Sequence, residues 1–172
     1  MKANITIMSG DGVGPEITQE AVKVLQAIEA VFDHDFSINE VLFGGIAIDE
    51  TGTPYPEETQ KSCKDSDAVL LGAVGGPKWS DPNMKVRPEK EGLLEMRSDL
   101  GIYANIRPIK TYPELIDNSP IKNRYLEGID MVFVRELTGG IYFGEKKKTD
   151  ESASDICEYS KVEIERITRV AA

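Results

Sequence analysis

Three arginines lie among apolar neighbours on three separate segments of the chain. Arg97 ends residues 93–97, Arg107 lies within residues 104–108, and Arg135 lies within residues 134–144. The formal net charge is −10, so a generally basic surface does not explain them. Guanidinium groups bind carboxylates through paired N–H donors. Any one of these arginines alone is more simply a surface charge, but the three together suggest a clamp for one polyanionic small molecule.

Tyr142 follows Arg135 across the pair Gly139-Gly140. A tyrosine close to a cluster of arginines is suited to act as a general acid. The sequence therefore predicts that the turn brings Tyr142 back to the end of the strand that carries Arg135.

Two glycine-rich segments could approach a ligand with their backbone. Residues 10–15 join an apolar run to a helix pattern, but Pro15 and Glu16 break the spacing of the dinucleotide fingerprint. We favour a tight turn over a phosphate loop there. Gly76, Pro77, Lys78 and Trp79 begin a long polar segment. Glycine and a flat indole suit either a ligand loop or a packed corner, and composition does not separate the two.

Other reactive side chains have simpler interpretations. His34 reads as an exposed helix-end residue, Cys63 as packing, Cys157 as a thiol without a partner pattern, and residues 146–148 as a solvated lysine run. Metal ions need converging carboxylates. The available aspartates form no recognisable set: Asp65, Asp67, Asp130 and Asp155.

Alternating strand and helix patterns must position these residues, and they predict an α/β fold with a largely parallel sheet. We expect strands at residues 4–8, 36–43, 68–71, 103–109 and 130–135, of which 68–71 and 130–135 are expected to be buried. We expect helices from Pro15 and at residues 56–63, 92–100 and 161–170. Residues 78–90 read as a loop, and residues 139–159 as an extended hairpin. Alternation from residue 103 places Tyr103, Asn105 and Arg107 on one face.

Bulk composition restricts the class of protein. No apolar run approaches the roughly 20 residues that span a bilayer, and the acidic charge argues against nucleic acid as a partner. Two cysteines favour a reducing, cytoplasmic setting over a disulfide scaffold. The chain stops at Ala172 with no following strand, so we expect the N-terminal half of a longer protein.

Residues 9–16, 72–79, 92–108 and 134–144 together resemble the isopropylmalate branch of the metal-dependent β-decarboxylating dehydrogenases. That family also includes isocitrate, homoisocitrate and tartrate dehydrogenases. The resemblance implies a bilobal isocitrate/isopropylmalate dehydrogenase-like fold without a Rossmann fingerprint, here incomplete. Residues 1–103 would belong to the first lobe and residues 104–172 would begin the second. The hairpin near residues 139–159 would be an arm that clasps a second subunit, which implies a homodimer.

The resemblance also implies roles for individual residues. Arg97, Arg107 and Arg135 match the arginines that hold substrate carboxylates, and Tyr142 matches the tyrosine that protonates the enol. Leu93 and Leu94 match apolar contacts to an isopropyl group, which favours isopropylmalate over isocitrate. Residues that match the nicotinamide-side NAD segment are Gly76, Pro77, Lys78, Trp79 and Glu89. One extra residue precedes Gly92, so Glu91 is an alternative to Glu89.

The implied reaction is an NAD-dependent oxidation of a 2-hydroxy-3-carboxy acid followed by decarboxylation, as in leucine biosynthesis, with Mg²⁺ or Mn²⁺. The family's catalytic lysine, metal-binding aspartates and adenosine segment would lie beyond Ala172, so we expect no turnover from these residues alone. Two alternatives stay open. One is a truncated, non-catalytic chain that binds or dimerises, which the intact mass of the native protein would reveal. The other is a sibling dehydrogenase acting on isocitrate, homoisocitrate or tartrate.

Overall fold

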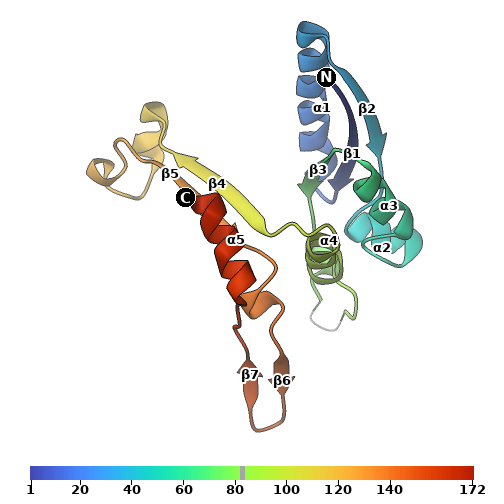
Figure 1. Cartoon of the computed structure of the whole chain (residues 1–172), viewed down its shortest axis with the longest axis vertical. Helices are drawn as coiled ribbons and strands as arrows, with labels where there is room; N and C mark the ends of the chain where they lie inside the picture. Colours follow the sequence, from blue (N-terminus) through green and yellow to red (C-terminus); the bar gives the residue numbers. More distant parts are fainter. Residues whose placement is uncertain (82–83) are drawn as a thin grey trace. The chain divides into compact units, whose positions relative to one another are not determined.

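The computed structural model describes residues 1–81 and 84–172. The chain forms two compact units, Met1–Leu100 and Gly101–Ala172 (Figure 1). Each unit has its own sheet and its own helices, and the assignment of these units to the two lobes of a bilobal enzyme remains a prediction. Among the helices of the described residues, none is long and apolar enough to cross a bilayer.

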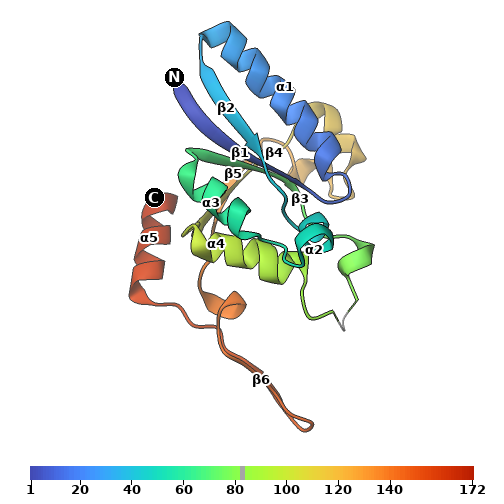
Figure 2. The same cartoon turned by 90° about the vertical axis from the view of Figure 1, so that its right-hand side faces the viewer.

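The first unit contains a three-stranded parallel sheet in the order β2-β1-β3. Its strands are β1 (Lys2–Gly10), β2 (Asp35–Glu40) and β3 (Ala68–Ala73). Helix α1 (Gly14–Phe32) connects β1 to β2, and α3 (Glu57–Asp65) precedes β3. These helices lie on opposite faces of the sheet (Figure 2). The predicted strand–helix alternation is confirmed here, although the second strand ends at Glu40 rather than at residue 43.

The core of the first unit lies between the sheet, α3 and the segment after β3. Its buried members are Met8, Phe43, Tyr55, Cys63 and Met96. Phe43 and Tyr55 meet edge to face with ring centroids 5.7 Å apart, a favoured aromatic geometry. The Cys63 thiol lies 3.8 Å from the Met8 sulfur, so Cys63 is a packing residue as predicted.

Two helical segments of the first unit differ from the sequence prediction. Helix α2 (Gly45–Thr51) was not predicted, because its seven residues are too few to show a helical repeat. The predicted helix at residues 92–100 begins earlier, as a π-helix over Pro88–Leu94 that continues into α4 (Glu95–Asp99). Proline suits the first position because it has no N–H to leave unpaired. The predicted loop at residues 78–90 is accordingly shorter, and Pro82 and Asn83 lie outside the described residues.

The second unit is built on an antiparallel ribbon of β4 (Ala104–Lys110) and β5 (Asp130–Glu136). A short hairpin of β6 (Lys146–Lys148) and β7 (Ala153–Asp155) follows, and then α5 (Lys161–Ala171). The extended hairpin and the last helix are confirmed. A largely parallel sheet is right for the first unit only, since both pairings in the second are antiparallel.

The prediction of a buried strand at residues 130–135 is wrong for the structure described. Val132 and Phe133 are 55% and 54% exposed. An apolar run of this length is typical of a strand covered on both faces. Here β5 pairs only with β4 and packs against α5, so its middle residues have no cover within the described residues.

Candidate active site

Asp11 joins three segments of the first unit, and sequence analysis missed it. Its carboxylate is buried and accepts three backbone hydrogen bonds: from Gly45 at 2.7 Å, Ile46 at 2.8 Å and Gly75 at 2.8 Å. It therefore caps α2 and fixes the glycine turn after β3. The available signal was an aspartate between glycines in a strand–helix turn, a residue type that commonly accepts backbone N–H bonds.

The turn at residues 10–14 brings backbone close to backbone. Gly10 has φ +73°, and a Cβ atom there would lie 2.0 Å from the carbonyl oxygen of Ala73. Only glycine fits this crossing. The structure thus gives the segment a packing reason for its glycines, which is the interpretation favoured from the sequence.

The segment proposed to contact NAD packs on α2. The Lys78 ammonium lies 2.6 Å from Asp49 of α2, and the Trp79 indole N–H donates to the same carboxylate at 3.3 Å. The Trp79 ring lies against Gly45, where a Cβ would approach to 2.3 Å. Gly76 and Pro77 come before this anchor, at the end of the turn that Asp11 fixes. The packed-corner interpretation is therefore right for the Trp79 ring, while the backbone before it stays partly exposed.

Glu89 and Glu91 occupy different environments. The Glu89 carboxylate faces Gly75, whose φ of +92° admits no side chain, and a Cβ there would lie 2.0 Å from Oε1 of Glu89. Within the described residues, no hydrogen-bond donor or cation pairs with Glu89. Glu91 instead accepts the backbone N–H of Arg87 at 2.8 Å and lies 3.2 Å from the Lys90 ammonium. Burial opposes ionisation of Glu91, but these partners outweigh it and leave the pKa of Glu91 below its ordinary value.

The exposed Glu89 carboxylate borders a shallow pocket lined by Trp79, Ser80, Arg87, Glu89 and Lys90. An unpaired carboxylate beside a glycine turn can accept hydrogen bonds from ligand hydroxyls or amides. The residues present therefore fit a polar part of a dinucleotide. Since Glu91 is already engaged at the start of the π-helix, where it accepts the Arg87 N–H, Glu89 is the better placed of the two.

Arg97 and the leucine pair lie on the helix that follows this pocket. Leu94 ends the π-helical segment, and Arg97 lies in α4; both are partly buried. Leu93 packs against the core of the first unit, so part of its surface is structural. These residues belong to the first unit, and their convergence with the other two arginines remains a prediction.

The structure brings together Arg107, Arg135 and Tyr142 in the second unit. Asn105 pairs directly with Arg135 across the ribbon, and Arg107 pairs with Phe133. Arg107 and Arg135 are therefore diagonal neighbours on one face, with Cβ atoms about 7–8 Å apart. The Arg107 Nε–H donates to the side-chain amide oxygen, Oδ1, of Asn105.

Tyr142 returns to Arg135 as predicted. The Arg135 guanidinium donates to the Tyr142 phenol oxygen and lies 5.1 Å from the ring centroid. Because the phenol oxygen accepts from Arg135, its own proton is free to point to a ligand. No carboxylate within residues 1–81 and 84–172 pairs with Arg107 or Arg135. Two guanidiniums without a counterion, beside a phenol, form an anion site with a proton donor.

The remaining reactive residues form no further cluster among the described residues. His34 was predicted to be exposed but is half-buried, because its ring stacks on Phe32 and lies tilted against Phe36, 3.3 Å from the N-terminal amine. Cys157 is exposed and free. In the part of the chain that the structure describes, no three His, Cys, Asp or Glu side chains converge to form a metal-binding group.

A sequence model of the family described as isocitrate/isopropylmalate dehydrogenase matches residues 4–172. The chain belongs to this family. A 3-isopropylmalate dehydrogenase from Bacillus caldotenax is 53% identical over 171 residues, covering 97% of this chain and 46% of that protein. The chain thus spans about half the length of the curated relatives it matches.

Solved structures of the isocitrate/isopropylmalate dehydrogenase family share the fold at lower identity. A β-decarboxylating dehydrogenase from Thermococcus kodakarensis matches with a TM-score of 0.68 and 30% identity, over 98% of this chain and 44% of that one. An isocitrate dehydrogenase from Methylococcus capsulatus matches with a TM-score of 0.70 and 29% identity, over 98% and 46%. The predicted fold class is confirmed.

Proposed function

We propose that this chain carries the carboxylate clamp and nicotinamide-side loop of a 3-isopropylmalate dehydrogenase of leucine biosynthesis. That enzyme oxidises 3-isopropylmalate with NAD and decarboxylates the product to 4-methyl-2-oxopentanoate. One face of the ribbon carries the proposal. On it, Arg107 and Arg135 have no carboxylate partner among the described residues, and the Tyr142 phenol accepts a hydrogen bond from Arg135. The choice of 3-isopropylmalate as the substrate is supported by the relative named 3-isopropylmalate dehydrogenase, which is 53% identical to this chain.

The arginines bind the two carboxylates of the substrate. Arg107 and Arg135 act from the ribbon, and Arg97 is the third arginine that the family resemblance assigns to the substrate carboxylates. Leu94, with the exposed part of Leu93, contacts the isopropyl group. An apolar pair is a poor neighbour for the third carboxylate of isocitrate, because that charge would lose hydration without gaining a partner.

Tyr142 donates the proton that the enol requires after carbon dioxide leaves. The hydrogen bond from Arg135 holds the phenol oxygen in place and offsets the negative charge left on it after transfer. The proton transfer therefore uses both residues of this hydrogen bond, with Tyr142 as the proton donor and Arg135 as the group that stabilises the phenolate.

NAD, when bound, would supply the hydride acceptor. Gly76 and Pro77 would let it approach the backbone and Glu89 would accept hydrogen bonds from it, while Lys78 and Trp79 hold the loop on α2. Mg²⁺ or Mn²⁺, when bound, would polarise the substrate carbonyl. Among the described residues, no group of three His, Cys, Asp or Glu side chains converges to hold the ion.

We also propose a cytoplasmic homodimer. Two free cysteines are consistent with a reducing compartment. The hairpin of β6 and β7 is exposed along its length and serves as the arm toward a second subunit.

Product analysis tests the reaction. The intact native protein, supplied with Mn²⁺, NAD and 3-isopropylmalate, is expected to give NADH, carbon dioxide and 4-methyl-2-oxopentanoate in equal amounts. NADH formation without carbon dioxide would show a simple alcohol dehydrogenase instead. Absence of any reaction would support the alternative of a non-catalytic chain.

A further inference from the structure

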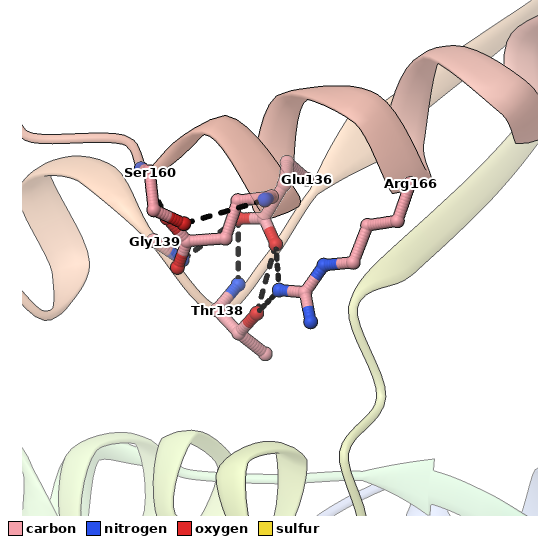
Figure 3. Close-up of polar contacts among 6 residues, drawn as sticks. Glu136, Thr138, Gly139, Ser160 and Arg166 are labelled. Atoms are coloured by element: carbon pink, nitrogen blue, oxygen red, sulfur yellow. Dashed lines mark hydrogen bonds and ion pairs between the residues drawn. The ribbon is translucent and has the colours of Figure 1, made fainter.

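Glu136, the residue after Arg135, is the most heavily hydrogen-bonded carboxylate of the second unit that the structure describes, and the proposed reaction does not use it. Its side chain is 8% exposed. Oε2 accepts the consecutive backbone N–H groups of Thr138 at 2.8 Å and Gly139 at 2.7 Å, and Oε1 accepts the Thr138 hydroxyl at 2.8 Å (Figure 3). The carboxylate therefore fixes the start of the turn that leads to Tyr142.

Arg166 of α5 completes this arrangement from a distant part of the sequence. Its Nη2 lies 2.8 Å from Oε1 of Glu136 and also donates to the Thr138 hydroxyl (Figure 3). The guanidinium stacks on the ring of Tyr103, 4.5 Å from its centroid. Burial alone would raise the pKa of Glu136, but the bonds from Thr138, Arg166 and Gly139 outweigh it and lower that pKa. The pair is therefore charged at neutral pH.

Arg135 and Tyr142 are held by different means. Arg135 is fixed by the ladder of the ribbon, where it pairs with Asn105. Tyr142 lies beyond the ladder, in the 3-10 turn Gly140–Tyr142. Between them, the Leu137 N–H donates to the Tyr103 carbonyl oxygen and the Gly140 N–H donates to the Glu158 carbonyl oxygen, both at 2.9 Å. The Glu136 carboxylate is the side-chain anchor between these two backbone bonds, because it accepts from the N–H groups of Thr138 and Gly139.

We infer that the Glu136–Arg166 pair is a positioning device that holds the Tyr142 hydroxyl against Arg135. The effect of the pair on turnover rests on the proposed function, whereas its effect on the contact between Tyr142 and Arg135 does not. If the pair is broken, Arg135 keeps its place in the ladder, whereas the turn that carries Tyr142 loses its side-chain anchor and keeps only its backbone bonds at Leu137 and Gly140. Breaking the pair should therefore slow the step that uses the Tyr142 proton, and it should weaken substrate binding much less.

The test compares three variants of the intact native protein. Arg166→Met removes the donors and keeps the aliphatic length, and Arg166→Lys keeps a cation that can still reach Glu136. Arg169→Met is the matched control, because Arg169 lies on the same helix with a side chain that is 81% exposed and 3.9 Å from Glu165. Nuclear Overhauser effects between labelled Tyr142 and Arg135 side chains report the contact, and kcat and KM report its consequence.

We expect Arg166→Met to lose the Tyr142–Arg135 signal and to lower kcat by about tenfold or more, a part of what a positioned general acid contributes. KM should change by less than about threefold, Arg166→Lys should recover part of kcat, and Arg169→Met should match wild type. A retained signal with an unchanged kcat would refute the inference, and so would a loss confined to KM.

Two further results keep the inference separate from the proposed function. If Arg166→Met does not fold, Glu136→Gln provides the same test, because an amide cannot accept on both of its terminal atoms. If wild type shows no turnover, the proposed function fails, and loss of the signal in Arg166→Met still supports the positioning role.

Discussion

The Tyr142 phenol is separated from Arg135 by seven positions in sequence and still accepts a hydrogen bond from it. The spacing of the two residues across a Gly-Gly pair was enough to predict this contact, because glycines permit a sharp return of the chain. Glu136 and Asp11 were not predicted. Their roles depend on backbone N–H groups that come from distant segments or from an irregular turn, and a residue pattern does not show those partners.

Removing the Tyr142 hydroxyl should affect the chemical step. Tyr142→Phe in the intact native protein is expected to lower kcat about a hundredfold, the lower end for a positioned general acid, with KM within about threefold of wild type. Tyr125→Phe is the matched control, since Tyr125 also accepts from an arginine, Arg124, at 2.8 Å, but is 60% exposed and lies outside the site. Equal rates for Tyr142→Phe and wild type would remove Tyr142 from the mechanism.

Among the elements, the long amphipathic helices and the order of the strands were predicted well, whereas the strand ends differ by up to three residues at the second strand. Helix α2 and the π-helical start at Pro88 were missed, because a few hydrogen bonds to the side chains of Asp11 and Glu91 stabilise them rather than a sequence repeat. The apolar run of β5 predicted a buried strand. Such a run indicates that a strand is typically covered on both faces, but it does not identify the element that covers it.

Helix α5 provides a prediction about acid stability. The backbone N–H of Ser160 donates to Glu163 at 2.6 Å and its hydroxyl donates at 2.8 Å, and these bonds lower the pKa of Glu163. A lowered pKa in the folded state stabilises the fold above the unfolded value, about 4.3, and this contribution is lost as pH falls through the folded value. The same direction holds for Glu136.

We therefore expect the free energy of unfolding to fall more steeply in wild type than in Glu163→Gln when pH decreases from 5 to 3. Urea titrations followed by circular dichroism at several pH values measure it. Glu165→Gln is the control, because Glu165 lies on the same helix and only pairs with exposed Lys161 and Arg169. Equal pH slopes for wild type and Glu163→Gln would contradict the role of the capping box.

At the scale of the whole molecule, residues with proposed roles are found in both units. The first unit carries Arg97, the leucine pair and the NAD-side loop, and the second carries Arg107, Arg135 and Tyr142. Hydrophobic periodicity could not assign these roles, because periodicity describes elements and not the ligands they bind. The family resemblance assigns them, and the assignment stays a prediction. The chain spans 46% of the length of the Bacillus caldotenax relative.

Substrate preference tests the central claim most directly. The ratio of kcat/KM for 3-isopropylmalate to that for isocitrate should be measured on the intact native protein with NAD and Mn²⁺. Arginines that bind two carboxylates beside a leucine pair predict a ratio of at least about 100 in favour of 3-isopropylmalate. Equal or faster turnover of isocitrate would contradict the account and assign the chain to a sibling dehydrogenase.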